Sequence, residues 1–372
     1  MRILTKISLV AILSAAAFSS CGTKQDINEL QTVNIDIDNA SDFEITPSMV
    51  VELETNDSSL IYDIENMVVA DNKLFIKSRD LLKFFNASDG KFLGNLASIG
   101  EGPGEYLFVN RLWNTDDTIH IFDSMSKKIN NYNSSGQFLS SRTLFENAPK
   151  TSADHPAVNF VIESPDGNGF YSINTWMGGV GKPVPSYSKY AADDSMEYLV
   201  KGRFLNCGSY GYSRAAVDRK HNRVLTWENC IDTLFAISDS TVRPLYALDY
   251  GKYSIPQHIQ SLPDMFDRML TLKDMEGCNL IVSSQYFTPV DNKIIYSIMH
   301  YNNIDGNDGI LIVTLDQDDA SARAVRLKDP SGRYIPQASI LVDGDYLYVA
   351  LRDSQNEEAN PSVARLPLSE FL

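Results

Sequence analysis

The fold is decided by one stretch of sequence, Met67-Val68-Val69-Ala70-Asp71-Asn72-Lys73-Leu74-Phe75-Ile76. An apolar run leads into a turn of Asp, Asn and Lys, and a second apolar run follows at once. Asp and Asn tolerate the positive φ that a tight turn between antiparallel strands requires. The stretch therefore predicts a β-hairpin.

This pattern of a turn followed by a strand occurs six times along the chain. The last turn residues of the six copies are Lys73, Thr118, Gly169, Arg223, Lys293 and Asp345. Neighbouring copies lie 45 to 70 residues apart. A second turn in each unit, clearest at Asp89-Gly90 and Ser135-Gly136, predicts a third and a fourth strand. Four strands per unit at a period of roughly 50 residues are typical of propeller blades. The sequence therefore predicts an all-β fold, a six-bladed β-propeller of four-stranded blades.

The two ends of this repeat predict how the ring closes. The sixth unit ends early, because only six residues follow its third strand at 362–366. The apolar segment 49–54 precedes the first unit and belongs to no blade. We expect this N-terminal strand to complete the sixth blade and so to leave no long open edge in the ring.

The longest spacing, between the fourth and fifth units, predicts an insertion at residues 255–277. Its apolar residues Leu262, Met265, Phe266, Met269 and Leu270 follow helical spacing. We expect one helical insertion between blades 4 and 5, packed on a face of the propeller or, alternatively, placed as a lid over its pore.

The first residues look like a processing signal. Arg2 and Lys6 precede an apolar stretch at 7–18, which is too short to span a membrane. The following Ser19-Ser20-Cys21-Gly22 resembles a bacterial lipoprotein signal, and the resemblance implies cleavage before Cys21 and lipidation of its thiol. An ordinary signal peptide is the alternative. We therefore expect a signal peptide at 1–20, an acidic tether at 21–47 with at most one short strand, and the propeller at 48–372.

Composition narrows the partners and cofactors. The chain has 32 Lys and Arg against 48 Asp and Glu, a net charge of −16, which argues against nucleic acid as a partner. Apart from Cys21, the cysteines are Cys207, Cys230 and Cys278; an odd number allows at most one disulfide, and we expect buried thiols. No zinc-site spacing occurs in the sequence, so no metal site is predicted.

Two further stretches carry a resemblance to a known family. They are Gly90-Lys91-Phe92-Leu93 followed by Ile99-Gly100-Glu101-Gly102-Pro103-Gly104-Glu105-Tyr106, and Asp232-Thr233-Leu234-Phe235-Ala236-Ile237 followed by residues 244–251. With the signal, the chain resembles the TolB-like six-bladed β-propeller lipoproteins of Bacteroides-type bacteria. The resemblance implies lipid anchoring in the cell envelope, at the outer membrane, but does not indicate which leaflet carries the anchor. The family has no agreed catalytic residues that could be assigned to this chain. Read physically, residues 100–106 connect blades 1 and 2, with Tyr106 buried.

The search for chemistry gives one candidate region. The sequence contains no Gly-x-Ser-x-Gly elbow and no phosphate loop. Residues 170–214 are rich in aromatic side chains around a Gly- and Pro-rich loop, where a sugar or a peptide could stack. The candidate ligand-binding residues are Trp176, Tyr187, Tyr190, Arg203, Tyr210, Tyr212 and Arg214. The alternative is that these aromatics pack between blades.

We therefore expect an envelope-anchored, non-enzymatic binding or scaffold propeller without a cofactor. Its partners would be the membrane, through the lipid anchor, and a glycan, a peptide or an envelope protein. The alternative is a propeller hydrolase, lyase or lactonase that uses acidic residues at the central pore, with Ca²⁺ as the implied ion. Three or four Asp, Glu, Asn or His side chains converging at the pore would favour the enzyme.

Overall fold

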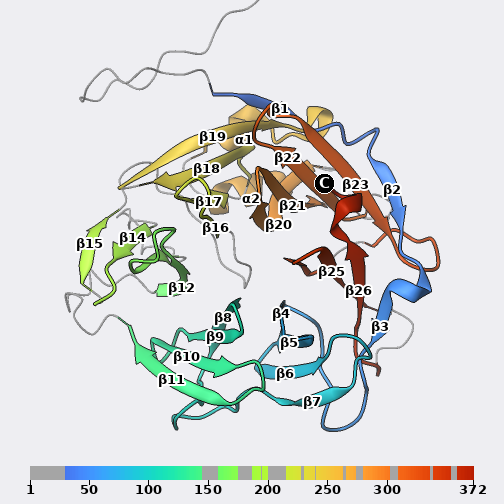
Figure 1. Ribbon diagram of the computed structural model, residues 1–372. Coiled ribbons are helices and arrows are strands. Elements are labelled where there is room, and N and C mark those ends of the chain that lie inside the picture. Colours follow the sequence, from blue (N-terminus) through green and yellow to red (C-terminus); the bar gives the residue numbers. More distant parts are fainter. Residues whose placement is uncertain are drawn as a thin grey trace, which may run out of the picture.

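The computed structural model describes residues 30–144, 158–174, 187–193, 195–199, 215–227, 230–238, 240–262, 265–273, 280–301, 309–335, 338–352 and 358–372. Its strands form six sheets around a central axis (Figure 1). The prediction of a six-bladed β-propeller is confirmed.

Each blade contains four antiparallel strands, and the first strand of each blade lies closest to the axis (Figure 1). Blades 1 and 2 consist of β4 (Asn66–Ala70), β5 (Lys73–Ser78), β6 (Leu81–Asn86) and β7 (Phe92–Asn95), and of β8 (Val109–Thr115), β9 (Thr118–Asp123), β10 (Lys128–Asn133) and β11 (Phe138–Thr143). Blades 3 and 4 consist of β12 (Val158–Glu163), β13 (Phe170–Asn174), β14 (Tyr187–Tyr190) and β15 (Met196–Leu199), and of β16 (Ala215–Asp218), β17 (Arg223–Trp227), β18 (Thr233–Ser238) and β19 (Thr241–Asp249). Blades 5 and 6 consist of β20 (Leu280–Val290), β21 (Lys293–Tyr301), β22 (Leu311–Asp316) and β23 (Ala322–Lys328), and of β24 (Ile340–Asp343), β25 (Tyr346–Leu351), β26 (Ser362–Pro367) and β3 (Val50–Glu52).

The first hairpin of each blade explains the repeat. Asp71 and Asn72 have φ angles of 48° and 55°, so both central turn residues are left-handed. This is the type I′ geometry that matches the twist of the flanking strands. Asn222, Asp291 and Gly344 hold equivalent positive φ angles in later blades.

The predicted ring closure is also confirmed. Strand β3 pairs antiparallel with β26, with Val51 opposite Val363. The buried side chain of Asn360 adds a polar link, because its oxygen accepts from the Ile61 amide at 2.8 Å and its nitrogen donates to the Glu54 carbonyl at 2.7 Å. The beginning and the end of the propeller are therefore joined by both backbone and side chain.

Residues 30–47 differ from the expected tether. Strand β1 (Thr32–Asn34) pairs parallel with β19 of blade 4, and β2 (Ser41–Glu44) pairs parallel with β23 of blade 5. Val33, Ile35 and Ile37 are buried against these blades, although acidic and polar residues alternate with them. Alternation buries one face of a strand and leaves the other in water, so an acid-rich segment still adds to a sheet. The expectation of a tether up to residue 47 is wrong from residue 30 onward.

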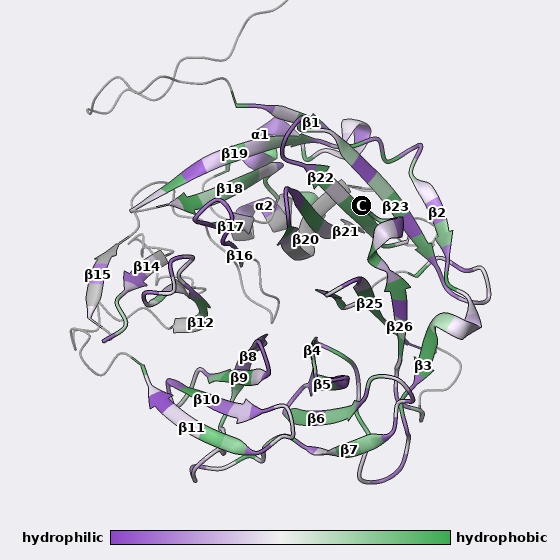
Figure 2. Ribbon diagram, in the orientation of Figure 1, coloured by the Kyte–Doolittle hydropathy of each residue, from purple (hydrophilic) through white to green (hydrophobic). Residues whose placement is uncertain are grey.

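The core lies between neighbouring blades. Among the described residues, apolar side chains of adjacent sheets form six buried clusters, and Figure 2 shows apolar residues along strands such as β6 and β25. Tyr106 is buried in the connection from blade 1 to blade 2, as expected, and its hydroxyl donates to the Asp80 carbonyl at 2.6 Å. Each blade therefore supports the inner strand of the next.

The expected helical insertion is present. Helices α1 (Gln257–Gln260) and α2 (Met265–Lys273) lie between β19 and β20, thus between blades 4 and 5. The side chain of Gln260 accepts from the Asp232 amide at 3.1 Å and so fastens α1 to blade 4. Among the described residues, the structure contains no helix with the length and apolar character needed to cross a membrane.

Candidate functional site

The sequence-predicted ligand residues fall mostly outside the described part of the chain. Tyr190 is described and is 1% exposed, with its ring stacked on Phe170 at a centroid distance of 5.2 Å. Its packing between blades 2 and 3 matches the alternative reading of these aromatics. Tyr187 begins β14, but its side chain is not described. The candidates outside the described residues are Trp176, Arg203, Tyr210, Tyr212 and Arg214, together with the proposed lipidation residue Cys21 and the cysteines Cys207 and Cys278. The remaining cysteine, Cys230, is buried as expected.

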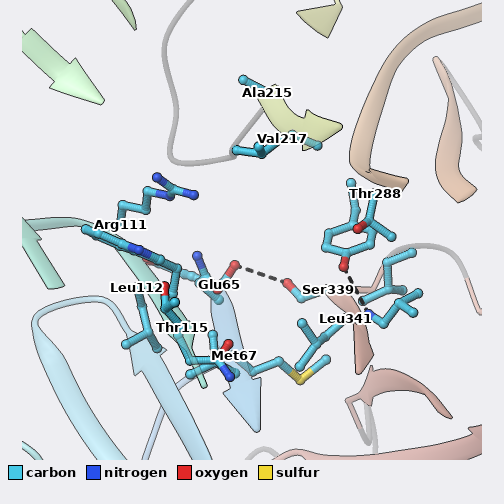
Figure 3. A pocket seen from close by; sticks show the side chains of 18 of the residues that line it. Glu65, Met67, Arg111, Leu112, Thr115, Ala215, Val217, Thr288, Ser339 and Leu341 are labelled. Atoms are coloured by element: carbon cyan, nitrogen blue, oxygen red, sulfur yellow. Dashed lines mark hydrogen bonds between the residues drawn. The ribbon is translucent and has the colours of Figure 1, made fainter. Parts of the chain in front are cut away.

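The described residues enclose a cavity of about 400 Å³ at the centre of the ring. The inner strands of all six blades line it (Figure 3). Part of the wall is apolar and comes from Met67, Ala215, Val217 and Leu341. All six blades contribute to the cavity because the blades are arranged radially and the first strand of each lies beside the axis.

Arg111 and Arg219 line this cavity, and Arg111 is the one for which no ion pair is described. Its guanidinium carbon lies 4.5 Å from the centroid of the Trp113 ring and 5.0 Å from that of Phe160. One nitrogen, Nη1, donates to the Val161 carbonyl at 2.6 Å, so the side chain reaches from blade 2 to blade 3. Two aromatic rings and a carbonyl fix the plane of the guanidinium.

Burial affects the acidity of this group. It lowers the pKa of Arg111 to about 10, and the nearby carboxylate of Glu163 opposes that shift. Arg111 therefore stays protonated at neutral pH. A cation held in a partly desolvated place attracts an anion more strongly than a cation in water.

Glu163 is the centre of a second polar group at the end of β12. Its Oε2 accepts from Nη2 of Arg219 at 2.8 Å, and its Oε1 lies 3.4 Å from Nε1 of Trp113 and 3.5 Å from the Thr115 hydroxyl. The ends of β8 and β12 and the turn after β16 bring these side chains together. Both oxygens of this carboxylate are thus occupied by protein donors.

Three polar residues that blades 1, 5 and 6 contribute to the cavity, Glu65, Tyr286 and Ser339, already have hydrogen-bond or ion-pair partners within the protein. The carboxylate of Glu65 pairs with Lys77, and the hydroxyl of Ser339 donates to the Glu65 carbonyl at 3.4 Å (Figure 3). The Tyr286 hydroxyl accepts from the Val342 amide at 2.9 Å, and burial raises the pKa of Tyr286 to about 12. Glu65, Ser339 and Tyr286 therefore form part of the cavity wall through hydrogen bonds and an ion pair within the protein.

In the described ranges, no three His, Cys, Asp or Glu side chains come together as a metal site would require. Glu65, Asn66, Asn114 and Glu163 do line the cavity. The described cavity thus presents Arg111 beside aromatic rings, together with Arg219, which is paired with Glu163.

Sequence reasoning missed Arg111, Trp113 and Glu163. A signal was available, because Arg111-Leu112-Trp113-Asn114 places polar residues on the first strand of a repeat unit. Inner strands of a propeller are buried on both faces, so polar side chains there need partners or a cavity.

Comparison with known proteins supports the fold. A search of curated protein sequences found no match. A protein from Bacteroides fragilis NCTC 9343 that is described as exported superimposes with a TM-score of 0.59 at 15% identity, covering 90% of this chain and 99% of that chain. A member of the DUF4221 family from Bacteroides vulgatus gives a TM-score of 0.45 at 11% identity, covering 85% and 95%. An inactive virginiamycin B lyase from Staphylococcus aureus gives 0.44 at 13%, covering 85% and 99%.

Only the first of these three structures has a TM-score above 0.5, and at its identity the likeness concerns the fold alone. A family model described as "Domain of unknown function (DUF4934)" matches residues 26–308, about three quarters of the chain. The match begins before β1, in agreement with the packing of residues 30–47 on the propeller. The chain therefore belongs to the DUF4934 family of β-propeller proteins.

Proposed function

We propose that this protein is a binding propeller of the bacterial cell envelope, anchored by a lipid on Cys21, of the TolB-like kind. Its ligand, a glycan fragment or a peptide segment, enters the central cavity. The observation that carries the proposal is the cavity of about 400 Å³ with Arg111 fixed at its wall. Pockets for small ligands typically measure about 300–1,000 Å³ and combine apolar walls with a few fixed polar groups.

The propeller suits recognition because its polar groups are positioned before a ligand arrives. Arg111 is held by two rings and one carbonyl, and the Glu163 carboxylate is held by Arg219. Prior ordering of this kind lowers the entropy cost of binding. A non-enzymatic role needs no more than these fixed contacts.

A binding screen tests the proposal. Glycan and peptide arrays are probed with the wild-type protein, with Val217→Trp, which fills the cavity, and with Met125→Trp, which places the same bulk on a 68% exposed residue. We expect hits that Val217→Trp loses and Met125→Trp retains, with circular dichroism showing that both variants fold. Hits that survive in Val217→Trp would place the ligand elsewhere, and the aromatic segment around Trp176 is then the next surface, tested by Trp176→Ala.

The anchor is tested separately. Metabolic labelling with a fatty acid and membrane fractionation compare the wild type with Cys21→Ala. We expect the wild type to be labelled and to sediment with outer membranes, and the variant to be unlabelled and released, because stable anchoring needs the acyl chains. An unlabelled wild type would refute the lipid anchor.

A further inference from the structure

We propose that the central cavity is a carboxylate site, in which Arg111 binds the acid group of a uronic-acid-bearing glycan or of a peptide C-terminus. The inference rests on the proposed role of the cavity in ligand binding and adds the chemical class of the ligand.

The charge of Arg111 has no direct counter-ion in the described part of the chain. Its contacts there are the Val161 carbonyl and the rings of Trp113 and Phe160. Nη1 accounts for one hydrogen bond, which leaves further N–H groups of the guanidinium without a described acceptor. Figure 3 shows this guanidinium projecting over the cavity.

The neighbouring carboxylates are already engaged. Glu163 accepts from Arg219, Trp113 and Thr115. Glu65, which precedes β4 on the adjoining blade 1, pairs with Lys77. Glu163 acts on Arg111 through its charge, but no ion pair between them is described, so an anion that reaches this partly buried cation is stabilised by it.

The aromatic rings favour an acid over a neutral sugar. The ring of Trp113 already lies against the Arg111 guanidinium and stacks on His120 at a centroid distance of 5.1 Å. A neutral sugar that stacked on Trp113 would compete with these contacts. A carboxylate instead uses N–H groups that the protein leaves open, and the planar fork of arginine matches its two oxygens.

The size of the cavity selects a terminal group rather than a long chain. At about 400 Å³ it lies near the lower end of the range for small ligands. A sugar acid or the last residues of a peptide fit this space and share one recognised group, the carboxylate. Two matched pairs of probes distinguish these sources.

The experiment measures calorimetric affinity for trigalacturonate and its methyl ester, and for a trialanine acid and its amide. The variants are Arg111→Met and Arg111→Lys. The matched control is Arg79→Met, which makes the same exchange at a residue that also lies over a ring, Tyr62 at 4.2 Å, but outside the cavity. We expect one acid to bind and its neutral partner to bind about 10- to 100-fold more weakly.

Arg111→Met is expected to lower the affinity for the acid by the same factor, equivalent to about 1.4–2.8 kcal/mol, and to leave the affinity for the neutral probe unchanged. Arg111→Lys restores part of the affinity, and Arg79→Met changes nothing. Equal binding of acid and neutral probes, or equal weakening of both by Arg111→Met, would overturn the carboxylate site while leaving a cavity ligand in place. Failure of both acids to bind at millimolar concentration would also overturn it, whereas array hits lost in Val217→Trp would still support the proposed function.

Discussion

Gly90 gives the sharpest test of how the ring closes. It lies in the turn between β6 and β7 of blade 1, with φ at +71°, and an added Cβ would lie 1.9 Å from the carbonyl oxygen of Glu52 in the closing strand β3. Gly167, in a turn of blade 3, has nearly the same φ of +73°, but its Cβ would meet no heavy atom within 4 Å. Alanine at either position is strained by the left-handed backbone, and only at Gly90 does it collide with the closure.

The geometry sets the size of the effect. The Glu52 oxygen would have to move from 1.9 Å to the 3.4 Å of an ordinary contact, a displacement of about 1.5 Å. Such a shift disrupts the pairing of Glu52 with Ser362 and the bond from the Glu54 amide to the Gly90 carbonyl, now 2.9 Å. Loss of two or three backbone hydrogen bonds at about 0.5–1.5 kcal/mol each amounts to about 1–4.5 kcal/mol. The left-handed conformation adds about 1–2 kcal/mol for alanine in either variant.

Urea unfolding followed by circular dichroism measures both variants. We expect Gly167→Ala to lose about 1–2 kcal/mol in the free energy of unfolding, from its backbone alone. Gly90→Ala should lose about 1–4.5 kcal/mol more than that. Equal losses in the two variants would refute the reasoning, because they would mean that β3 yields to the methyl group without cost to the ring.

Two further predictions concern buried polar groups. Asn360→Ala removes the acceptor of the Ile61 amide and should lower the free energy of unfolding by about 2–4 kcal/mol. The control Asn168→Ala, at an exposed turn, should change it by no more than about 0.5 kcal/mol. Equal urea midpoints for the two variants would contradict the role of Asn360. Burial raises the pKa of Asp232 to about 7 from an unfolded value near 3.8, so the unfolded chain releases this proton first and the folded state loses stability as the pH rises between the two values. Asp232→Asn has no carboxyl group to titrate, so the free energy of unfolding of this variant, measured with urea, should increase relative to that of the wild type from pH 4 to pH 8. A difference between variant and wild type that does not change with pH would argue against the raised pKa of Asp232.

The architecture was accessible from the sequence because local rules determine it. Turns such as Asp71-Asn72 require left-handed residues, and these residues recur once per blade. The missing fourth strand of the last unit, together with the spare strand around Val51, specified the closure. The turns are recognised from a few adjacent residues, and the closure from the number of strands in each repeat unit. Neither signal requires knowledge of contacts between residues far apart in the sequence.

The outer strands and the cavity were not accessible in the same way. The acidic composition around Val33 and Ile35 suggested a solvated segment, and its partner strand β19 lies more than 200 residues away. The ion pair of Glu163 and Arg219 joins residues 56 positions apart. A single polar residue in a strand, such as Arg111, can point to solvent or to the axis, and only the closed ring decides between these.

The three N-terminal strands β1, β2 and β3 lie on blades 4, 5 and 6, in the order in which the chain leaves its N-terminus. Tension on the chain ahead of Thr32 would therefore act first on β1, whose ladder pairs three residues with β19, and next on β2, whose ladder pairs four with β23. The strand that completes the sixth blade, β3, therefore follows two other paired strands, and a force applied ahead of Thr32 meets both of their ladders before it reaches the ring closure.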